Sequence, residues 1–455
     1  MLTFKIESSE INGRFDPRFY NPIFKETIEK IIEKGKKPGY RVIKLGNVVN
    51  MKTSAFYGAI AESYGKIGIP FIRVSDVRTF SISPTDLVSI PEIIALENPS
   101  IATLRSGDIV ITKGGTVGNV AIVPKWMSKC KICRDVIGLE VTGDIRPEYI
   151  LLFLASRFGM IQIDRMRTQQ IQSHLTIEPL KNIKILISDE HEEKISNMLL
   201  KVGELGEESL SQIHEAQNKL YESIGIKIYN YNNTNGFSIN YNKINDNLTP
   251  SYYSPRFLNI IKDLKNQFNT YKIGDIASIQ KGNEVGSANY RELIDKEDTD
   301  VPFIRTSDIV NYEVDDFPDY YIDNSIYDEL DQDIKVNDLL VNNDGKIGFL
   351  AILTQEDKCI IQSHIRRMRF SNLDDCYFAL AFLSTHYGQL QFERYSFTQA
   401  TIPTMSGHLS DVIIPEIDSN DKRKIVDLIR KAFEIKSEKK KLLKKTIKDF
   451  ETALD

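Results

Sequence analysis

The chain contains a long internal repeat whose two copies start 233 residues apart. Residues 4–24 align without a gap with residues 237–257, and eight of these 21 positions are identical. Farther along, Phe71-Ile-Arg-Val-Ser-Asp-Val matches Phe303-Ile-Arg-Thr-Ser-Asp-Ile, and Gly107-Asp-Ile-Val-Ile matches Asn337-Asp-Leu-Leu-Val. A repeat of this length is a whole domain rather than a solenoid unit. We therefore expect two similar domains, related by a pseudo-twofold, and a bipartite function.

The composition is that of an ordinary globular protein. No apolar run in the 455 residues approaches the roughly 20 that a membrane span requires, and the N-terminus lacks a basic and then apolar signal sequence. Four cysteines are too few for a disulfide scaffold, which fits a reducing compartment. The sequence therefore predicts a cytoplasmic protein.

The net charge of −5 hides a strong segregation of charge along the chain. Residues 36–185 carry 20 basic against 12 acidic residues, whereas residues 186–224 carry 3 against 9. The second copy reverses both signs, with 12 basic against 26 acidic residues in 269–416 and 12 against 8 in 417–455. The first large domain is thus basic and the second acidic.

Each copy alternates short β-rich segments with irregular loops and then ends in one long amphipathic segment. This pattern predicts a mixed α/β (α+β) fold, with two globular domains separated by two long helices of about 50 Å. Glu-rich and Lys-rich helices favour pairing with each other, so we expect an antiparallel coiled coil. Two unrelated surface helices are the alternative. The predicted packing positions are Ile195, Val202, Leu205, Ile213, Leu220, Ile425, Leu428, Ile435, Leu442, Ile447 and Phe450.

These patterns predict five segments. Residues 1–188 form the first domain, 189–225 the first long helix, and 226–235 a polar junction. Residues 236–418 form the second domain and 419–455 the second long helix.

Three motifs resemble catalytic or metal-binding sequences but lack essential parts. Asp16-Pro-Arg-Phe-Tyr20 resembles an amino-methyltransferase loop without its second proline, and Gly114-Gly-Thr-Val-Gly118 is not followed by the Gly-Lys-Ser/Thr of a phosphate loop. Cys130 and Cys133 have zinc spacing, but the second copy supplies no matching pair. The sequence therefore predicts no metal site and no catalysis in this chain.

Both copies offer side chains suited to reading duplex DNA, which requires Arg, Lys, Asn, Gln, Ser or Thr on a rigid frame. The first-copy candidates are Arg73, Ser75, Lys113, Thr116, Asn119, Arg134, Arg167, Gln169, Gln170, Gln172 and His174. Those of the second copy are Arg305, Ser307, Asn343, Lys346, Gln362, His364, Arg366, Gln399 and Thr401. A structural alternative exists for two strings: Asp76 and Asp308 could cap turns, and residues 114–118 could form a tight turn.

The ordered set of repeated strings resembles the specificity (S) subunit of Type I restriction–modification systems. The strings are Phe71–Val77, Ser106–Gly118, their copies Phe303–Ile309 and Asn337–Gly348, and the long helix that closes each half. The resemblance implies two target-recognition domains that each read half of a gapped duplex site, with an antiparallel coiled coil that sets the spacer.

The resemblance also implies partners. Two modification (methyltransferase) subunits would bind near the helices and repeated segments, and restriction (translocase–nuclease) subunits would join the larger assembly. S-adenosylmethionine, ATP and Mg would belong to those partners, with no cofactor in this chain. Because phosphate contacts need positive charge, the acidic second domain either faces away from DNA or leaves phosphate contacts to partners. A protein scaffold or decoy for methyltransferases, which would not read DNA, is the alternative function.

Overall fold

The computed structural model describes residues 5–7, 11, 14–55, 60–167, 174–226, 236–245, 247–293, 295–399, 402–405 and 407–455. The chain divides into two compact units, here called unit 1 (1–203 and 441–455) and unit 2 (204–440). Each long helix therefore begins in one unit and ends in the other. The predicted segments follow elements rather than these units, and their boundaries stay a prediction.

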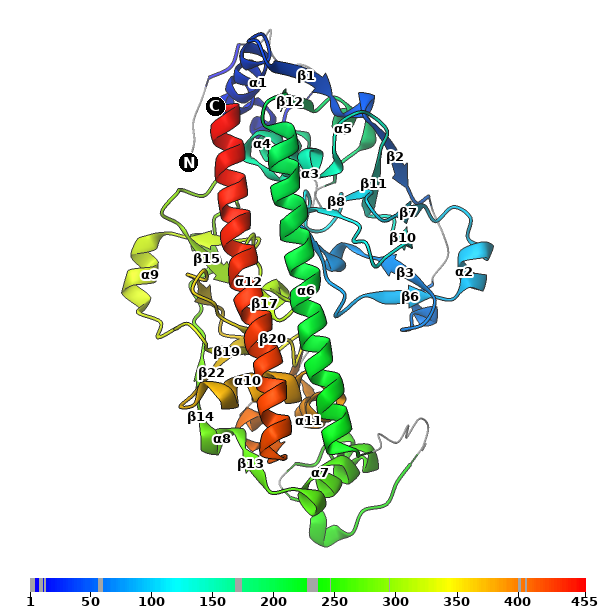
Figure 1. The fold of residues 1–455 in the computed structure, drawn as a ribbon, viewed down its shortest axis with the longest axis vertical. Helices are drawn as coiled ribbons and strands as arrows, with labels where there is room; N and C mark the ends of the chain where they lie inside the picture. Colours follow the sequence, from blue (N-terminus) through cyan, green and yellow to red (C-terminus); the bar gives the residue numbers. More distant parts are fainter. Residues whose placement is uncertain are drawn as a thin grey trace. The chain divides into compact units, whose positions relative to one another are not determined.

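Unit 1 is a mixed α/β domain with two four-stranded sheets, ordered β6-β3-β10-β7 and β2-β11-β8-β9 (Figure 1). Its elements are α1 (Pro22–Lys34), β1 (Tyr40–Lys44), β2 (Val49–Thr53), β3 (Ile69–Ile72), β4 (Val77–Arg78), β5 (Ser81–Ile82), β6 (Val88–Ile90), α2 (Glu92–Glu97), β7 (Thr103–Arg105), β8 (Ile109–Thr112), β9 (Val120–Ile122), β10 (Lys129–Ile132), β11 (Val136–Val141), α3 (Pro147–Ala155), α4 (Arg157–Met166), α5 (Ile177–Lys181), β12 (Lys184–Ser188) and the first part of α6 (Glu192–Ile224).

Unit 2 repeats this order around the sheets β14-β22-β19-β20 and β18-β15-β21. Its elements are α7 (Pro255–Gln267), β13 (Thr270–Lys272), α8 (Ile273–Ile276), β14 (Ala277–Lys281), β15 (Val301–Ile304), β16 (Ile309–Val310), β17 (Glu313–Val314), β18 (Tyr321–Ile322), α9 (Asn324–Leu330), β19 (Leu339–Asn342), β20 (Leu350–Ile352), β21 (Ile360–Ile361), β22 (Ile365–Phe370), α10 (Leu373–Leu383), α11 (His386–Tyr395), β23 (Phe397–Gln399), β24 (Ile402–Thr404), β25 (Ile413–Pro415) and the first part of α12 (Ser419–Leu454).

The strand pairing confirms that the two units are copies of one fold. In each unit the strand that carries the Phe-Ile-Arg string pairs in parallel with a later strand: Phe71 lies opposite Lys131, and Phe303 lies opposite Ile360. The central sheet pairs in the same antiparallel order in both, through β11 with β8 and through β22 with β19. The repeat in the sequence thus predicts a repeat in hydrogen bonding.

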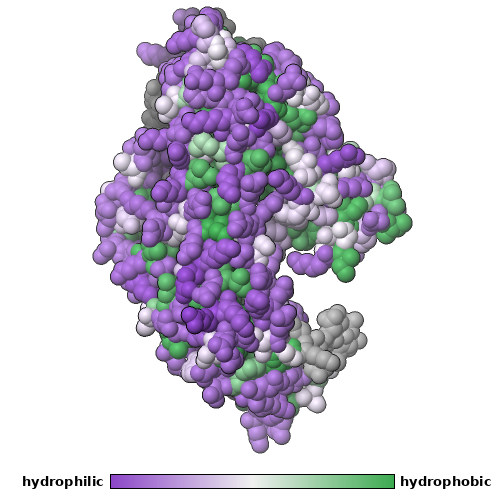
Figure 2. All heavy atoms as spheres, in the orientation of Figure 1, coloured by the Kyte–Doolittle hydropathy of each residue, from purple (hydrophilic) through white to green (hydrophobic). Residues whose placement is uncertain are grey.

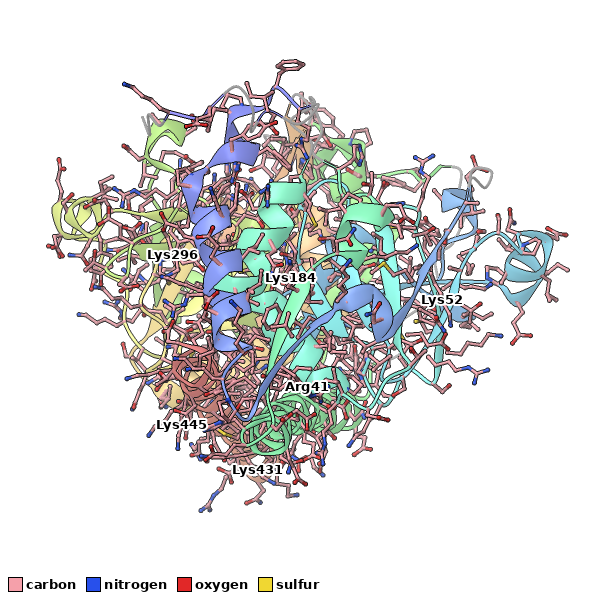
Figure 3. The ribbon with its side chains drawn as sticks, turned by 90° about the horizontal axis from the view of Figure 1, so that it is seen from above. Arg41, Lys52, Lys184, Lys296, Lys431 and Lys445 are labelled. Atoms are coloured by element: carbon pink, nitrogen blue, oxygen red, sulfur yellow. The ribbon has the colours of Figure 1, made fainter. Side chains whose placement is uncertain are left out.

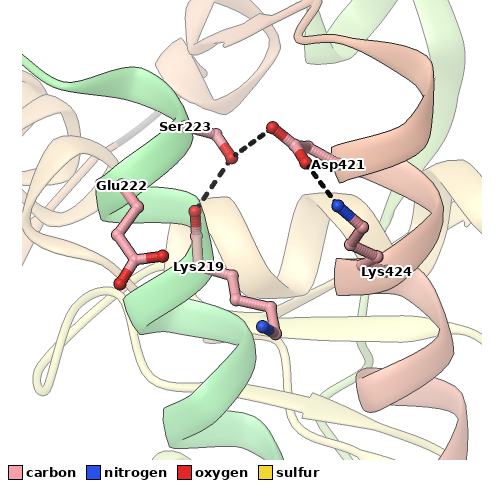
Figure 4. Close-up of a pocket in the computed structure, with 5 residues that line it drawn as sticks. All are labelled: Lys219, Glu222, Ser223, Asp421 and Lys424. Atoms are coloured by element: carbon pink, nitrogen blue, oxygen red, sulfur yellow. Dashed lines mark hydrogen bonds and ion pairs between the residues drawn. The ribbon is translucent and has the colours of Figure 1, made fainter.

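The long helices run antiparallel within unit 2, where Figure 1 shows their halves side by side. The Ser223 hydroxyl near the end of α6 donates to Asp421 near the start of α12, at 3.2 Å (Figure 4). Gly206 lies seventeen residues before Ser223 on α6, and Lys439 lies eighteen residues after Asp421 on α12. A Cβ at Gly206 would lie 3.7 Å from Cδ of Lys439. The contacts nearer the start of α6 are made with residues nearer the end of α12. The two helices are therefore antiparallel, as the sequence predicts.

Most of the predicted packing positions on these helices are buried. In unit 2, Ile213, Leu220 and Ile425 belong to one core cluster with residues of α7, α10 and α11. In unit 1, the ring of Phe450 packs edge-on against Tyr149 of α3, at a centroid distance of 5.2 Å. The apolar residues of both helices therefore pack against the domains as well as between the two helices. Of the whole set, Ile195, Val202, Leu205, Ile213, Leu220, Ile425, Ile435 and Phe450 are buried, and Leu428, Leu442 and Ile447 are half-buried.

The surface of unit 1 includes an apolar area over α2, seen as green atoms in Figure 2. It contains the largely exposed side chains of Ile93 and Leu96, one helical turn apart. Within the described ranges, no helix is both long enough and apolar enough to cross a membrane.

Candidate nucleic-acid interface

The loop after β8 in unit 1 and the loop after β19 in unit 2 adopt the same turn. Gly115 and Gly345 both have φ of 72°, and Gly118 and Gly348 have φ of 99° and 81°. These left-handed values are costly for residues with a Cβ, which explains why the string Gly-x-x-Gly occurs in both copies. The predicted tight turn is therefore present in both units. Lys113 and Thr116 of unit 1 are half-buried there, and Lys346 of unit 2 is exposed.

In each unit this loop meets two other segments at one place, which we call the loop junction. In unit 1 the Lys113 amide donates to the Asp135 carbonyl, and the Lys113 carbonyl accepts from Leu175, both at 2.9 Å. In unit 2 the Asn343 amide donates to the His364 carbonyl, and the Asn343 carbonyl accepts from Met405, both at 3.0 Å. Backbone bridges between Gly114 and His174, and between Asp344 and Thr404, complete the match.

The junction of unit 2 holds a connected set of polar side chains. The Asp344 carboxylate lies 2.6 Å from Nδ1 of His364. It also accepts from the hydroxyl of Thr404 and from the side-chain Nδ2 of Asn343. Burial alone raises the pKa of Asp344, but these hydrogen bonds bring the pKa below its usual value. Asp344 thus stays ionised and fixes the His364 ring through Nδ1, which leaves Nε2 as the ring nitrogen for an external group. The His364 side chain is 43% exposed.

The junction of unit 1 holds an aspartate and a histidine at other positions. Gly114 occupies the position of Asp344, and a Cβ there would lie 3.0 Å from Asp135 Oδ1 and 3.2 Å from His174 Cε1. Asp135 stands where unit 2 has His364, and His174 stands where unit 2 has Thr404. The backbone of the junction is therefore constant, whereas the side chains that it presents differ between units.

Several predicted residues surround the two junctions. Arg134 and Lys346 are exposed, and Lys113, Thr116, Gln362 and Arg366 are half-buried. The Arg366 guanidinium donates to the Ser363 carbonyl at 2.7 Å, and burial lowers its pKa. Two predicted amides turn inward: Asn119 donates to the Val77 carbonyl at 3.1 Å, and Asn343 is fully buried. Geometry thus favours the exposed members over Asn119 and Asn343 as DNA contacts.

The repeated Arg-x-Ser-Asp string forms a turn in both units. Arg73 pairs with the buried Asp76 through Nε and Nη2, at 3.0 and 2.9 Å, and Asp76 also accepts from the Arg73 amide. In unit 2 the buried Asp308 accepts from the Arg305 amide and from the hydroxyl of Ser307. The turn-capping alternative for both aspartates is therefore confirmed. Arg73, Ser75, Arg305 and Ser307 have structural roles here, and DNA contact by them stays a prediction.

Five predicted residues cannot be placed as side chains. Gln169, Gln170, Gln172 and Thr401 lie outside the described residues, and for Gln399 only the backbone in β23 is described. Arg167, just before the first of these segments, forms an ion pair with Asp164 at 3.2 Å.

Sequence reasoning missed Asp135, Asp344 and Thr404 as junction residues. Their strings were visible beside chosen candidates, but an acid is an unfavourable neighbour for phosphate. Strand pairing brings these positions together from distant segments, so the sequence alone does not show which side chains meet.

Acidic residues of unit 2 are neutralised within the unit. Lys436 and Lys439 of α12 pair with Glu313 of the β16–β17 hairpin at 3.5 and 2.5 Å, and Lys440 pairs with Asp357, between β20 and β21, at 2.6 Å. Burial alone raises the pKa of Glu313, but the three lysine charges outweigh it and hold the pKa at about 2. The Lys-rich helix lies beside the Glu-rich helix in unit 2, as expected, and these three lysines bind acids of the domain that packs on α12.

Figure 3 labels three basic residues of unit 1, Arg41, Lys52 and Lys184, which lie on β1, β2 and β12. Arg41 pairs with Asp189 at 3.1 Å and Lys52 with Glu140 at 3.2 Å. Among the described residues, no group of three or more His, Cys, Asp or Glu could hold a metal ion. Cys130 is a buried thiol whose pKa burial raises to about 12.

A family model described as "Type I restriction modification DNA specificity domain" matches the sequence twice, over residues 38–216 and 265–447. The chain belongs to this family. The two matches contain the two loop junctions, so the specificity subunit carries one junction in each copy of the family domain. Its function is DNA recognition, and by family it is a non-catalytic subunit.

The solved structures that the chain matches include an S subunit of a Type I restriction–modification system from M. genitalium, which is 12% identical. That match covers 91% of this chain and 94% of the other, with a TM-score of 0.34. The HsdS subunit from Thermoanaerobacter tengcongensis is 16% identical over 92% and 95% of the two chains, with a TM-score of 0.28. These scores are below 0.5, so the family assignment rests on the sequence match. No curated protein sequence matches the chain.

Proposed function

We propose that this specificity subunit reads a bipartite duplex site, and that the loop junction of each unit contacts one half of it. The observation that supports the proposal is the pair of matched junctions with different side chains. A constant backbone that presents Gly, Asp and His in unit 1 but Asp, His and Thr in unit 2 suits two readers of different half-sites. Readers with identical residues would favour two identical half-sites.

The residues around each junction have the chemistry for reading base edges. Exposed Lys346 and Arg134 suit the acceptors of guanine, and an aspartate suits the amino group of cytosine. His364, held by Asp344 at one nitrogen, offers one oriented nitrogen to a base. In the major groove each base pair presents a distinct pattern of donors and acceptors, so a few such side chains suffice for discrimination.

The long helices would set the distance between the half-sites. Thirty-three residues in α6 and 36 in α12 correspond to about 50 Å of helix at 1.5 Å per residue. This length is about one and a half turns of B-DNA at roughly 34 Å per turn. The spacer of the recognised site would follow from it.

The partners in this proposal are two modification (methyltransferase) subunits and the restriction (translocase–nuclease) subunits. Adenine-N6 methylation and ATP-dependent DNA cleavage would take place in them, with S-adenosylmethionine, ATP and Mg bound there. Two matching exposed apolar side chains support two equivalent docking points: Phe15 is 88% exposed, and Leu248, which aligns with it, is 80% exposed. A duplicated surface suits two copies of one partner.

The test of DNA reading is the set of methylated sites in cells that express the complete system with His364→Asn or Asp344→Asn. A lost base contact costs about 1–3 kcal/mol of discrimination, so we expect relaxed or altered bases in one half-site only. The matched control is His408→Asn, because His408 forms another half-exposed pair with an aspartate of unit 2, Asp411, at 3.4 Å.

The control should leave the methylated site unchanged. Unaltered sites in both junction variants at normal methylation levels would contradict the proposal, and so would changes in both halves.

A further inference from the structure

Unit 1 carries three exposed apolar side chains at and beside α2, which we call the apolar patch: Ile67, Ile93 and Leu96. They are 90, 58 and 75% exposed, and Figure 2 shows the area over α2 in green. Ile93 and Leu96 are three residues apart and therefore share one face of the helix. Large apolar side chains that gather on a surface mark a contact with another molecule.

The loop that carries Ile67 lies against the strand that leads into α2. Gly65 exchanges two backbone hydrogen bonds with Ser89 of β6, at 2.9 and 2.7 Å. A Cβ at Gly68 would lie only 2.3 Å from the carbonyl oxygen of Ile90, and α2 begins two residues after Ile90. Ile67 therefore lies beside the start of α2, and the three side chains belong to one surface.

Unit 2 contains the same helix in the same place, as α9. In unit 1, Ile69 of β3 lies opposite Ile90 of β6, and α2 begins two residues later. In unit 2, Val301 of β15 lies opposite Ile322 of β18, and α9 begins two residues later. These registers align the two helices without a gap.

The aligned helices differ on their exposed sides. Each residue of the apolar patch aligns with an exposed polar residue of unit 2: Thr299, Ser325 and Asp328, in that order. Between them, Ile94 aligns with Ile326, and both pack on a core cluster of their unit. Folding thus accounts for the apolar residues that face inward, but not for those of the apolar patch.

Carboxylates at the two ends of α2 favour a protein over DNA as the molecule that covers the patch. Glu92 and Glu97 are exposed and form no ion pair with a described residue, and Lys66 offsets one of their charges. Negative charge repels phosphates, so DNA is an unfavourable occupant. A second copy of this chain would bring two net negative surfaces together. A partner with apolar side chains inside a basic rim fits both features.

The apolar patch and the loop junction lie at opposite ends of β3. Ile67 precedes the strand, and Cγ1 of Val74, which follows it, would lie 3.6 Å from a Cβ at Gly115 of the junction loop. Seven residues of chain join Ile67 to Val74, which limits the distance between their Cα atoms to about 25 Å. An enzyme that modifies a base near the junction could therefore also reach the patch.

We propose that the apolar patch of unit 1 docks one modification subunit, and that unit 2 makes no equivalent contact. The inference rests on the proposed function, which supplies the partner. The docking face of that subunit carries apolar side chains within a rim of lysine or arginine. This contact adds to the paired docking points at Phe15 and Leu248, so the two modification subunits are held with unequal affinity.

The test is calorimetric titration of the full-length chain with the purified modification subunit, without DNA. The wild-type chain should show two sites of unequal affinity. The triple variant Ile67→Thr, Ile93→Ser and Leu96→Asp introduces residues that the fold of unit 2 already accepts at these positions. Loss of interface hot-spot residues weakens binding by roughly 30-fold or more, so the tighter site should weaken by that factor while the other stays unchanged.

A second variant tests the charge of the partner. Glu92→Gln with Glu97→Gln keeps the apolar patch and should weaken the same site at low salt, with a smaller effect at high salt, because salt screens the attraction. The matched control is Ser325→Ala with Asp328→Asn, at the aligned positions of α9. It should leave both sites unchanged.

Four results would overturn the proposal. They are two equal sites in the wild-type chain, an unchanged tighter site in the triple variant, loss of both sites in that variant, and self-association of the wild-type chain that the triple variant abolishes. The last result would assign the patch to a second copy. Because the titration contains no DNA, its failure leaves base reading to be decided separately by the methylated sites.

Discussion

At the scale of single residues, the sequence indicates which strings matter but not what each side chain does. Arg73 and Arg305 have the residue type and repeat position expected of a base reader, yet each is paired with an aspartate that caps its turn. DNA contact by His364 stays a prediction, and its carboxylate partner Asp344 was not foreseen. The reason is physical, since the role of a polar side chain depends on neighbours that strand pairing brings from distant segments.

The buried lysines of unit 2 give a prediction at this scale. Lys440 is fully buried between Asp357, at 2.6 Å, and Asp316, at 3.4 Å. Lys440→Met should cost about 3–5 kcal/mol of unfolding free energy, because it leaves carboxylates buried without their cation. Lys431→Met, at an exposed position of the same helix, should stay within about 0.5 kcal/mol. Urea unfolding of the full chain measures both, and equal stabilities would contradict the prediction.

The pH dependence of this network follows from Glu313. Its pKa is lowered from 4.5 to about 2, so its ion pairs contribute stability above pH 4.5 that is lost as the pH falls toward 2.

At the scale of elements, periodicity predicts the helices well and their charge partners poorly. Both predicted long helices are present, as α6 and α12, and they run antiparallel within unit 2 as the sequence predicts. The opposite charges of the long helices predicted that they would pair, and they do, but three lysines of α12 bind Glu313 and Asp316 of unit 2. Charge counts along a helix do not reveal which neighbour lies against each face.

The segments that precede α1 and α7 give the prediction at this scale. Phe15 and Leu248 are aligned, largely exposed apolar residues of the two copies. If each docks one modification subunit, Phe15→Ser or Leu248→Ser alone should reduce the number of co-purifying modification subunits from two to one, and the double variant should bind none. Native mass spectrometry counts them.

Tyr241→Ser is the control, because Tyr241 is 83% exposed in unit 2 near the same segment. It should keep two partners. Two partners retained by both single variants would refute the docking role.

At the scale of the whole molecule, the repeat in the sequence indicates most of the architecture. Two copies of one fold and two long helices follow from it, and the structure bears out both. The repeat does not predict how the side chains of the two copies differ in their roles. On a matching backbone, the loop junctions present Gly114, Asp135 and His174 in unit 1 but Asp344, His364 and Thr404 in unit 2.

The central claim is that the two units read their half-sites independently. It is tested most directly by replacing residues 36–185 with the matching segment of another specificity subunit and sequencing the methylated sites in cells that express the assembled system. We predict a new sequence in one half of the site, with the other half and the spacer retained. A change in both halves, or in neither at normal methylation levels, would contradict the account.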